Sequence, residues 1–214
     1  MIIQRVIKGL QQLSKASAQA ILDSGIECNL CRLKGQIAYA EIPKMLTERN
    51  LEWHQDHFED PDPLWNNPKD ELFHDHTPFI STTAGTVERR KGQNVRRKAF
   101  EIALKFATDR LTVDGWLFYC DLFVLGRPTV ELPAFSDELR ELNVHTRYSV
   151  HQTEGEIVAK ILIPPTQIEQ AHFFDVSDVK DALNKGEIPS PNDTLSNALY
   201  VDPSLYNNVR GFID

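Results

Sequence analysis

The first candidate residues are three hydroxyls in a row, Ser81, Thr82 and Thr83, in the stretch "HDHTPFISTTAG". They directly follow the apolar step Phe79-Ile80. Hydroxyls next to a short strand can satisfy local backbone groups. They can also form the inner wall of a site that orients a ligand. Other residues of the chain are needed to distinguish these two interpretations.

A guanidinium and a pair of carboxylates accompany the hydroxyls. Arg32 lies in "CNLCRLKG", for which we predict a strand, and Glu154 and Glu156 open a later predicted strand in "HQTEGEIVAKILIPP". The planar fork of an arginine matches the oxygens of a phosphate or a carboxylate. Alternation along a strand places Glu154 and Glu156 on one face, where like charges repel. The pair is therefore mildly unfavourable unless it has a role.

Hydrophobic periodicity predicts the elements that would position these residues. Residues 4–22 carry apolar side chains at helical spacing, and Ser24-Gly25 supplies a stop. Residues 54–78 contain four prolines, many acids and little periodicity, as functional or mobile segments do. The predicted strands are "IECNLCRL", "PFISTT", "GWLFYCDLFVL" and "EGEIVAKILIPP", and the other predicted helices are in "IPKMLTERNLEWH" and "NVRRKAFEIALKFATDRL".

Length and composition fit one globular domain. The chain has 214 residues, of which 41% are hydrophobic and 25% charged, enough for one sizeable core but not for two. We predict a single α+β domain over 1–214, with an N-terminal helix in 1–25 and a surface-wrapping tail in 185–214. No apolar run approaches the roughly 20 residues that span a bilayer. Charged residues interrupt the N-terminus, so no secretory signal is predicted and we expect a cytoplasmic protein.

In this chain order, the arginine, the hydroxyl run and the glutamate pair resemble the motifs of the ADP-ribosyltransferases of the arginine–serine–glutamate type. That family carries an arginine on its first strand and a Ser-Thr-Ser-like step on a middle strand. A Glu-x-Glu or Gln-x-Glu pair leads a late strand. The resemblance covers roughly residues 28–170. It implies a single ADP-ribosyltransferase-like domain, in which mixed β-sheets form an NAD cleft with flanking helices, and NAD as the co-substrate.

The resemblance also implies roles for individual residues. Glu156 would be the catalytic acid, because breaking the bond between nicotinamide and ribose creates positive charge that a carboxylate stabilises. Glu154 would activate or position the acceptor. Arg32 would bind the diphosphate or ribose of NAD. Ser81 would orient the ribose and the catalytic glutamate.

The chain departs from the family pattern in two places. Thr83 stands where a second serine is commoner, and with Thr82 it would complete the cofactor site by holding the strand in position. More residues than usual separate Glu156 from the end of its strand. A Gln-x-Glu register is therefore an alternative, with Glu154 as the catalytic acid and Gln152 on the acceptor side. We favour Glu156 because it immediately precedes the apolar strand.

Two segments are candidates for contact with the acceptor. In the resembling family the loop before the glutamates meets the acceptor, often through an aromatic residue, which implies Tyr148 with Arg147 beside it. A basic cluster at residues 89–98, "RRKGQNVRRK", contrasts with the net charge of −8 and includes Arg96 and Arg97. Such a cluster suits a phosphate-bearing partner. A solvated helix start, or an acidic antitoxin or inhibitor as partner, would explain it too.

The three cysteines, Cys28, Cys31 and Cys120, are an odd count without a predicted secretory signal, which disfavours a disulfide framework. The spacing Cys28-x-x-Cys31 fits half of a zinc site. A structural zinc site normally has four ligands in paired spacings. We therefore predict buried free thiols and no metal.

The function that the resemblance implies is that of an NAD-dependent mono-ADP-ribosyltransferase. We expect a bacterial intracellular toxin of a toxin–antitoxin or anti-phage defence system, acting on a macromolecular acceptor, with RNA slightly favoured over protein or DNA. No membrane partner is expected. The alternatives are a protein-modifying effector, an RNA 2′-phosphotransferase, and a non-catalytic binding module on the same fold.

Overall fold

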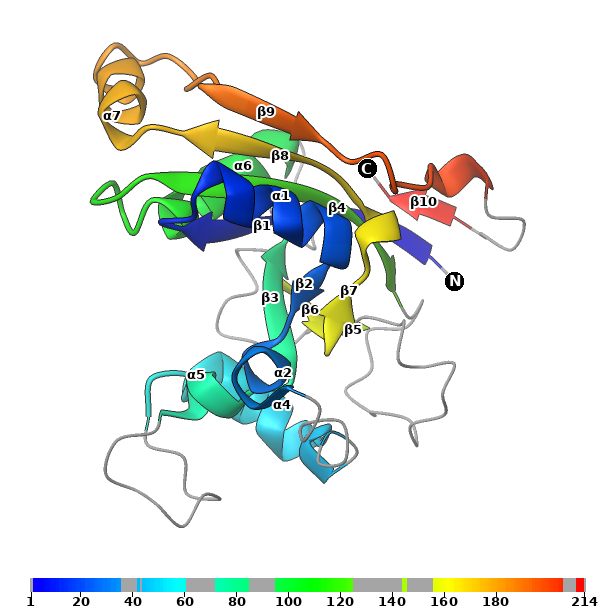
Figure 1. Cartoon of the computed structure of the whole chain (residues 1–214). Coiled ribbons are helices and arrows are strands. Elements are labelled where there is room, and N and C mark those ends of the chain that lie inside the picture. The colour runs from blue at the N-terminus through cyan, green and yellow to red at the C-terminus, as the bar shows by residue number, and fades with distance from the viewer. Residues whose placement is uncertain are drawn as a thin grey trace.

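The computed structural model contains one large and one small β-sheet with helices packed around them (Figure 1). It describes residues 2–35, 42, 44–60, 72–84, 95–124, 144–145, 156–205 and 211–213. The strands in these ranges are β1 (Ile2–Gln11), β2 (Ile26–Glu27), β3 (Phe79–Thr83), β4 (Gly115–Val124), β5 (Val144–His145), β6 (Glu156–Lys160), β7 (Leu162–Ile163), β8 (Ile168–Phe174), β9 (Asp193–Ser196) and β10 (Gly211–Ile213). The helices are α1 (Lys15–Ser24), α2 (Asn29–Lys34), α4 (Glu48–Asp56), α5 (Phe73–His76), α6 (Val95–Ala107) and α7 (Val176–Asn184), with 3₁₀ turns η4 (Pro165–Gln167) and η5 (Pro203–Leu205).

The large sheet has the strand order β5-β6-β3-β1-β4-β8-β9, with β10 paired in parallel to the start of β1. Strands β1 and β4 are paired over ten residues, whereas β1 meets β3 at the single registered pair Ile7↔Thr83. The sheet therefore changes direction at this pair. Figure 1 shows β3 and β6 running from β1 toward the group formed by α2, α4 and α5. The predicted α+β class, with mixed sheets and flanking helices, is confirmed.

Two helices cover opposite faces of the β1–β4 pair. On one face, Val6 of β1 belongs to the same buried cluster as Leu22 of α1. On the other face, Ile7 packs in a cluster with Leu117 of β4 and Ala103 of α6. Burying one such aliphatic side chain stabilises the fold by roughly 1.5–3 kcal/mol.

Two glycines allow α6 to lie directly on the sheet. A Cβ on Gly115 of β4 would lie 2.0 Å from the carbonyl oxygen of Ala107, and one on Gly9 of β1 would lie 2.5 Å from that of Ala103. Both obstacles are helix backbone, which cannot turn aside as a flexible side chain could. The close helix–sheet contact therefore depends on the absence of side chains at these positions.

We expect Gly115→Ala to lower the free energy of unfolding by about 1–3 kcal/mol or more, because the new methyl group forces α6 away from β4. Thr194→Ala, at an exposed position of β9, serves as the control and should change stability by no more than about 0.5 kcal/mol. Urea unfolding measures both values. Equal stability of Gly115→Ala and the unmodified protein would contradict the close packing.

The prediction of a helix over residues 4–22, and over 1–25 as a whole, is wrong for its first half. Residues 2–11 form β1, and only α1 is helical, starting after the N-cap Ser14, whose side chain accepts a hydrogen bond from the Ser17 amide. The predicted stop at Gly25 is confirmed by its φ of 97°. A strand buried on both faces shows no alternation of apolar and polar residues. The spacing of Val6 and Leu10 is therefore compatible with a helix as well as with a strand.

The segment "IECNLCRL" is also not one strand. It divides into β2 and α2, with the extended Cys28 between them as the N-cap of the helix. Leu30 and Cys31 are buried while Arg32 and Leu33 are exposed, a burial pattern that fits a helix face and not strand alternation. Residues 54–78 are more regular than predicted, because α4 continues to Asp56 and α5 precedes β3.

The remaining predicted elements are present. The strands "PFISTT" and "GWLFYCDLFVL" are β3 and β4, and the helix "NVRRKAFEIALKFATDRL" contains α6. The strand "EGEIVAKILIPP" is divided into β6 and β7 by Ile161, which has a φ of 66°. None of the described helices is both long and apolar enough to cross a membrane.

The tail does more than wrap the surface, because β9 extends the large sheet and β10 pairs with β1. A partly buried polar cluster holds the tail against the sheet before β10. The Tyr200 hydroxyl donates to Asp121 Oδ2 at 2.5 Å, and Arg5 of β1 pairs with the same carboxylate at 2.8 Å and with Glu169 of β8. The prediction of a surface-wrapping tail rested on its content of Pro, Asn and Ser, which gives no signal for the short strands β9 and β10.

Candidate functional site

Ser81 and Glu156 lie on one face of two neighbouring strands. β3 and β6 are antiparallel, with Ser81 opposite Val158 and Thr83 opposite Glu156. Registered partners in an antiparallel pair point to the same side, as do residues two apart on one strand. Ser81 and Glu156 are therefore diagonal neighbours, a separation that long side chains can bridge. Glu156 is buried, with 9% of its surface exposed.

Helix α4 adds two side chains to this face. Its N-cap Thr47 accepts a hydrogen bond from the Asn50 amide, which fixes the start of the helix. One turn later, His54 Nε2 lies 2.8 Å from the Ser81 hydroxyl oxygen. Gln55 Nε2 donates a long hydrogen bond of 3.4 Å to Glu156 Oε2. Consecutive residues of α4 thus contact the hydroxyl and the carboxylate.

His54 is held as a neutral imidazole. It is 4% exposed, and its ring packs against Phe58 and Phe79, with centroids 5.3 and 5.6 Å away. Burial, helped by the charge of Lys8, lowers the pKa of His54 to about 3. Its Nδ1 lies 2.8 Å from Thr77 Oγ1, so both ring nitrogens are hydrogen-bonded to hydroxyls. One nitrogen of a neutral imidazole donates and the other accepts, which orients the ring firmly toward Ser81.

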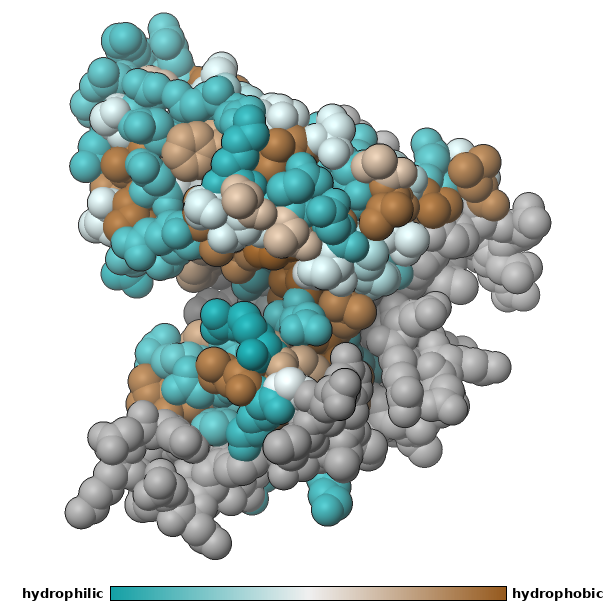
Figure 2. All heavy atoms as spheres, viewed as in Figure 1, coloured by the Kyte–Doolittle hydropathy of each residue, from teal (hydrophilic) through white to brown (hydrophobic). Residues whose placement is uncertain are grey.

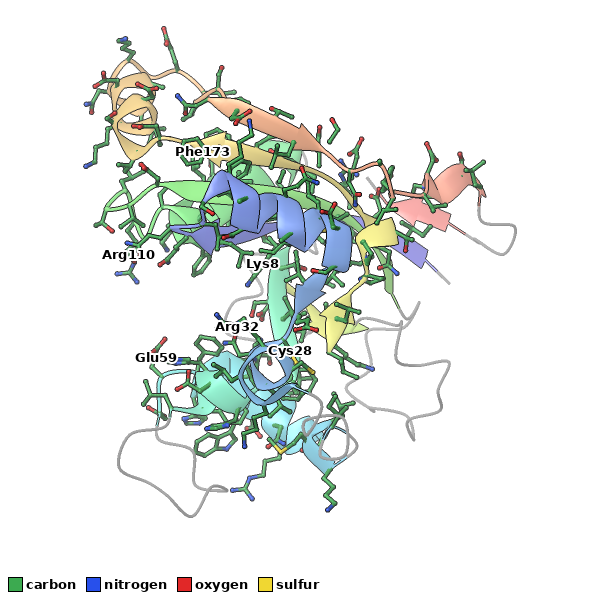
Figure 3. The ribbon with its side chains drawn as sticks, viewed as in Figure 1. Lys8, Cys28, Arg32, Glu59, Arg110 and Phe173 are labelled. Carbon is green, nitrogen blue, oxygen red and sulfur yellow. The ribbon has the colours of Figure 1, made fainter. Side chains whose placement is uncertain are left out.

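Lys8 of β1 supplies the cation of the site. Figure 3 places it beside the upper end of β3, where β1 and β3 meet. Its side chain is half-buried, and burial lowers its pKa to about 8, while the Glu156 carboxylate acts in the opposite direction. Within the described residues, no hydrogen bond joins Lys8 Nζ to an acceptor. The ammonium is therefore available to an anionic ligand near Glu156.

The two threonines of the hydroxyl run differ from Ser81. Thr82 points to the opposite face of β3, and its hydroxyl donates to the Ile157 carbonyl oxygen at 2.6 Å. This bond ties β3 to β6, so Thr82 holds the strand in position. Thr83 is buried between Ile7 and Glu156 in the strand register. Of the three hydroxyls, Ser81 is the one that His54 contacts.

Arg32 is placed differently from the prediction. It lies in α2 and not in a strand, its side chain is exposed, and its guanidinium donates to Asn29 Oδ1 at 3.2 Å. Figure 2 shows the surface hollowed between the layer that contains α1 and the group of α2, α4 and α5. In the view of Figure 3, Lys8 lies above this narrowing and Arg32 below it. The charge of Lys8 acts on Glu156 and on His54, whereas Arg32 is bonded within its own helix, and a role for Arg32 in binding NAD stays a prediction.

Several predicted site residues cannot be placed. Glu154, Gln152, Tyr148 and Arg147 lie outside the described residues. Arg96 and Arg97 belong to the first turn of α6, but their side chains are not among those described, and most of the basic cluster precedes that helix.

The cysteines are free and buried, as predicted. In the described ranges, no three or more His, Cys, Asp or Glu side chains are grouped as a metal site would require.

Lys8 and His54 were missed by the sequence analysis. Lys8 counted only as one of the charged residues that interrupt the N-terminus and exclude a secretory signal, and His54 only as part of the acidic, proline-containing segment 54–78. A lysine between Ile7 and Gly9 would have been conspicuous only in a segment interpreted as a strand. No local signal links His54 to Ser81, because their contact is made by tertiary packing.

The site combines groups of complementary chemistry. A buried carboxylate can stabilise a positive charge that develops beside it. A hydroxyl fixed by a neutral imidazole can orient a sugar hydroxyl, and an ammonium can hold a phosphate. All of these groups extend from regular elements, so their positions are set by the sheet and by α4.

No protein-family model and no curated protein matches the chain. Among solved structures, the chain is similar to EcPltA, with a TM-score of 0.48 at 14% sequence identity, over 98% of this chain and 91% of that chain. It is also similar to an arginine-to-lysine mutant of heat-labile enterotoxin, with a TM-score of 0.43 at 14% identity, over 97% of this chain and 82% of that chain. At these values, neither likeness assigns an activity or a site residue to this chain.

Proposed function

We propose that this protein is an NAD-dependent mono-ADP-ribosyltransferase whose site is formed by Glu156, Ser81, His54 and Lys8. The observation that carries the proposal is the convergence of Ser81 and Glu156 on one face of β3 and β6, with His54 bonded to the serine. The motifs that suggested this activity lie 75 residues apart in sequence, from position 81 to position 156, yet they occupy one site. This convergence supports a catalytic role better than a purely structural one.

The chemistry of ADP-ribose transfer suits these groups. As the bond between nicotinamide and ribose breaks, positive charge grows on the sugar. The Glu156 carboxylate, kept from water, stabilises that charge in the transition state more than in the ground state. Ser81, oriented by His54, hydrogen-bonds the ribose or the carboxylate and keeps the two aligned. The acceptor nucleophile then takes the place that nicotinamide leaves.

NAD fits the donors present in the site. Its diphosphate carries negative charge, and Lys8 offers an ammonium that no acceptor among the described residues occupies. We assign diphosphate binding to Lys8, with Arg32 as the second cation across the hollow. Glu154 remains our candidate for activating the acceptor, and Thr82 and Thr83 hold the strand that carries Ser81.

The acceptor that we propose is a nucleic acid, RNA before DNA, and the biological role is that of an intracellular toxin with a cognate antitoxin. The basic residues from 89 to 98 support this choice, because a chain with a net charge of −8 carries them together. The loop that contains Arg147, Tyr148 and Gln152 would present the acceptor to the site. A protein acceptor would use this loop without the basic cluster.

The proposed function is tested with NAD labelled in its adenylate part. The full-length protein is incubated with this NAD and a total cell lysate, and the products are treated separately with protease, DNase and RNase. We expect labelled macromolecules whose label RNase releases. The absence of both labelled products and free nicotinamide would rule out the proposed activity, and label released by protease alone would transfer it to a protein acceptor.

The basic cluster gives a sharper test of the acceptor. We expect Arg96→Ala/Arg97→Ala/Lys98→Ala to reduce transfer to RNA and to reduce the salt dependence of that transfer. A variant that contacts fewer phosphates releases fewer counterions when it binds RNA. Hydrolysis of NAD by water should stay near its normal rate, because the four site residues are unchanged. Tyr148→Ala is the matched variant: loss of transfer in it alone would indicate a protein acceptor docked through the loop.

A further inference from the structure

Two cysteines stand one turn apart at the start of α2, and Figure 3 labels the first of them, Cys28. Cys28 is the extended N-cap residue, with φ −65° and ψ 160°, and Cys31 is the third residue of the helix. Both are free thiols, 1% and 4% exposed. A Cys-x-x-Cys pair at the beginning of a helix has the spacing of dithiols that close into a disulfide. The site described above makes no use of this pair.

The two thiols interact with each other. The contact with Cys28 lowers the pKa of Cys31, and the same contact, together with burial, raises the pKa of Cys28. The thiolate is the form that reacts with oxidants. Cys120 is a useful contrast, because it is fully buried in β4 and burial raises its pKa. The pair therefore differs chemically from the third cysteine of the chain.

Helix α2 is bonded to the elements that carry the candidate site. The Cys28 amide donates to the Ile161 carbonyl at the end of β6, at 2.7 Å, and the Leu30 amide donates to the Thr77 carbonyl, at 3.2 Å. Thr77 in turn contacts His54 Nδ1 through its hydroxyl. Two hydrogen bonds, from Leu30 to Thr77 and from Thr77 to His54, thus connect the turn between the two cysteines to the imidazole that orients Ser81.

We propose that Cys28 and Cys31 are a peroxide-sensitive dithiol, whose reversible disulfide weakens the positioning of His54 by shifting the N-terminal turn of α2. The formation of the disulfide is inferred from the geometry of α2 alone. Its effect on catalysis rests on the proposed function.

The oxidant is hydrogen peroxide, which is small enough to suit thiols that are almost completely buried. The Cys31 thiolate attacks one peroxide oxygen, the O–O bond breaks, and hydroxide leaves to become water, giving a sulfenic acid on Cys31. The Cys28 sulfur then attacks the Cys31 sulfur, the S–O bond breaks, and a second water leaves with the Cys28 proton. Two thiols lose two electrons in total, and one peroxide is reduced to two waters.

Disulfide formation must move the helix backbone. The two sulfurs, now in non-bonded contact, have to come within about 2.05 Å of each other. Cys28 and Leu30 lie within the turn that tightens, and their amides hold Ile161 and Thr77. A shift of Thr77 changes the hydrogen bond on which the orientation of His54 depends. The disulfide should therefore lower NAD cleavage without unfolding the protein.

The test treats the full-length protein with hydrogen peroxide, blocks remaining thiols with N-ethylmaleimide after denaturation, and identifies the peptides by mass spectrometry. We expect an intramolecular Cys28–Cys31 disulfide, with Cys120 still labelled, and recovery of both thiols in dithiothreitol. NAD cleavage should fall several-fold on oxidation and return on reduction. Cys31→Ser should be insensitive to peroxide, Cys28→Ser should form the sulfenic acid on Cys31 without a disulfide, and Cys120→Ser should respond as the unmodified protein does.

A second measurement keeps the inference separate from the proposed function. Hydrogen exchange of the Leu30 amide should accelerate in the oxidised protein, whether or not the protein cleaves NAD. Labelling of Cys28 and Cys31 after peroxide treatment would overturn the dithiol. A disulfide that leaves both the Leu30 amide and NAD cleavage unchanged would overturn the link to His54. Absence of NAD cleavage in the reduced protein would instead count against the proposed function.

Discussion

Glu156→Gln should lower the rate of NAD cleavage by about 10²–10³-fold, the usual loss when one preorganised electrostatic contact is removed. Glutamine keeps the shape of the side chain and can still accept the hydrogen bond from Gln55, but it lacks the charge that stabilises the developing cation. Because that charge matters mainly in the transition state, NAD binding should change little. Nicotinamide release measures the rate, and calorimetry measures the binding.

Two other glutamates make the comparison informative. Glu27→Gln, at an exposed position of β2, is the control and should cleave NAD normally. Glu154→Gln should retain NAD hydrolysis and lose transfer, because we assign Glu154 to the acceptor. The opposite pattern, with Glu154→Gln inactive and Glu156→Gln near normal, would establish the Gln-x-Glu register in which Gln152 precedes the catalytic acid.

The sequence predicted the strands that carry Ser81 and Glu156 because their signals are local. "PFISTT" combines β-branched residues with a leading proline, and the run after Glu156 is apolar until the Pro164-Pro165 stop. Burial on both sides, seen at the adjacent residues Leu117 and Phe118 in β4, leaves a continuous apolar run that also indicates a strand. These strands assemble the half of the site that the motifs identified.

The other two residues of the site, Lys8 and His54, could not be predicted, because their positions depend on tertiary contacts that leave no local sequence pattern. The spacing of Val6 and Leu10 fits a helix as well as a strand buried on both faces. The segment is a strand because its backbone pairs with β4 over ten residues. The wrong helix prediction concealed Lys8, whose charge acts on Glu156 although β3 lies between their strands. His54 reaches Ser81 only because α4 packs against β3, through contacts such as that between His54 and Phe79, whose ring centroids lie 5.6 Å apart.

Lys8→Ala should weaken NAD binding by about tenfold to a hundredfold, the range expected for losing one charge-assisted contact of roughly 1.5–3 kcal/mol. Lys8 is half-buried beside Glu156, where water competes less for the diphosphate than at an exposed position. Arg32→Ala is the matched variant and should have the smaller effect, because Arg32 is exposed and already donates to Asn29. Calorimetry with NAD compares the two. A large loss in Arg32→Ala with none in Lys8→Ala would restore the arginine of the original motif as the cation.

The pH dependence of the same contact provides an independent measurement. The pKa of Lys8 is lowered to about 8 by burial, so the ammonium is charged below that pH and loses its proton as the pH rises through it. Because kcat/KM reports groups of the free enzyme, kcat/KM for NAD should fall above about pH 8. At saturating NAD the bound diphosphate keeps Lys8 protonated, so kcat should stay flat over the same range. Lys8→Arg should abolish the fall in kcat/KM, since a guanidinium remains charged throughout. A fall that persists unchanged in Lys8→Arg would assign the titration to another group and remove Lys8 from the NAD site.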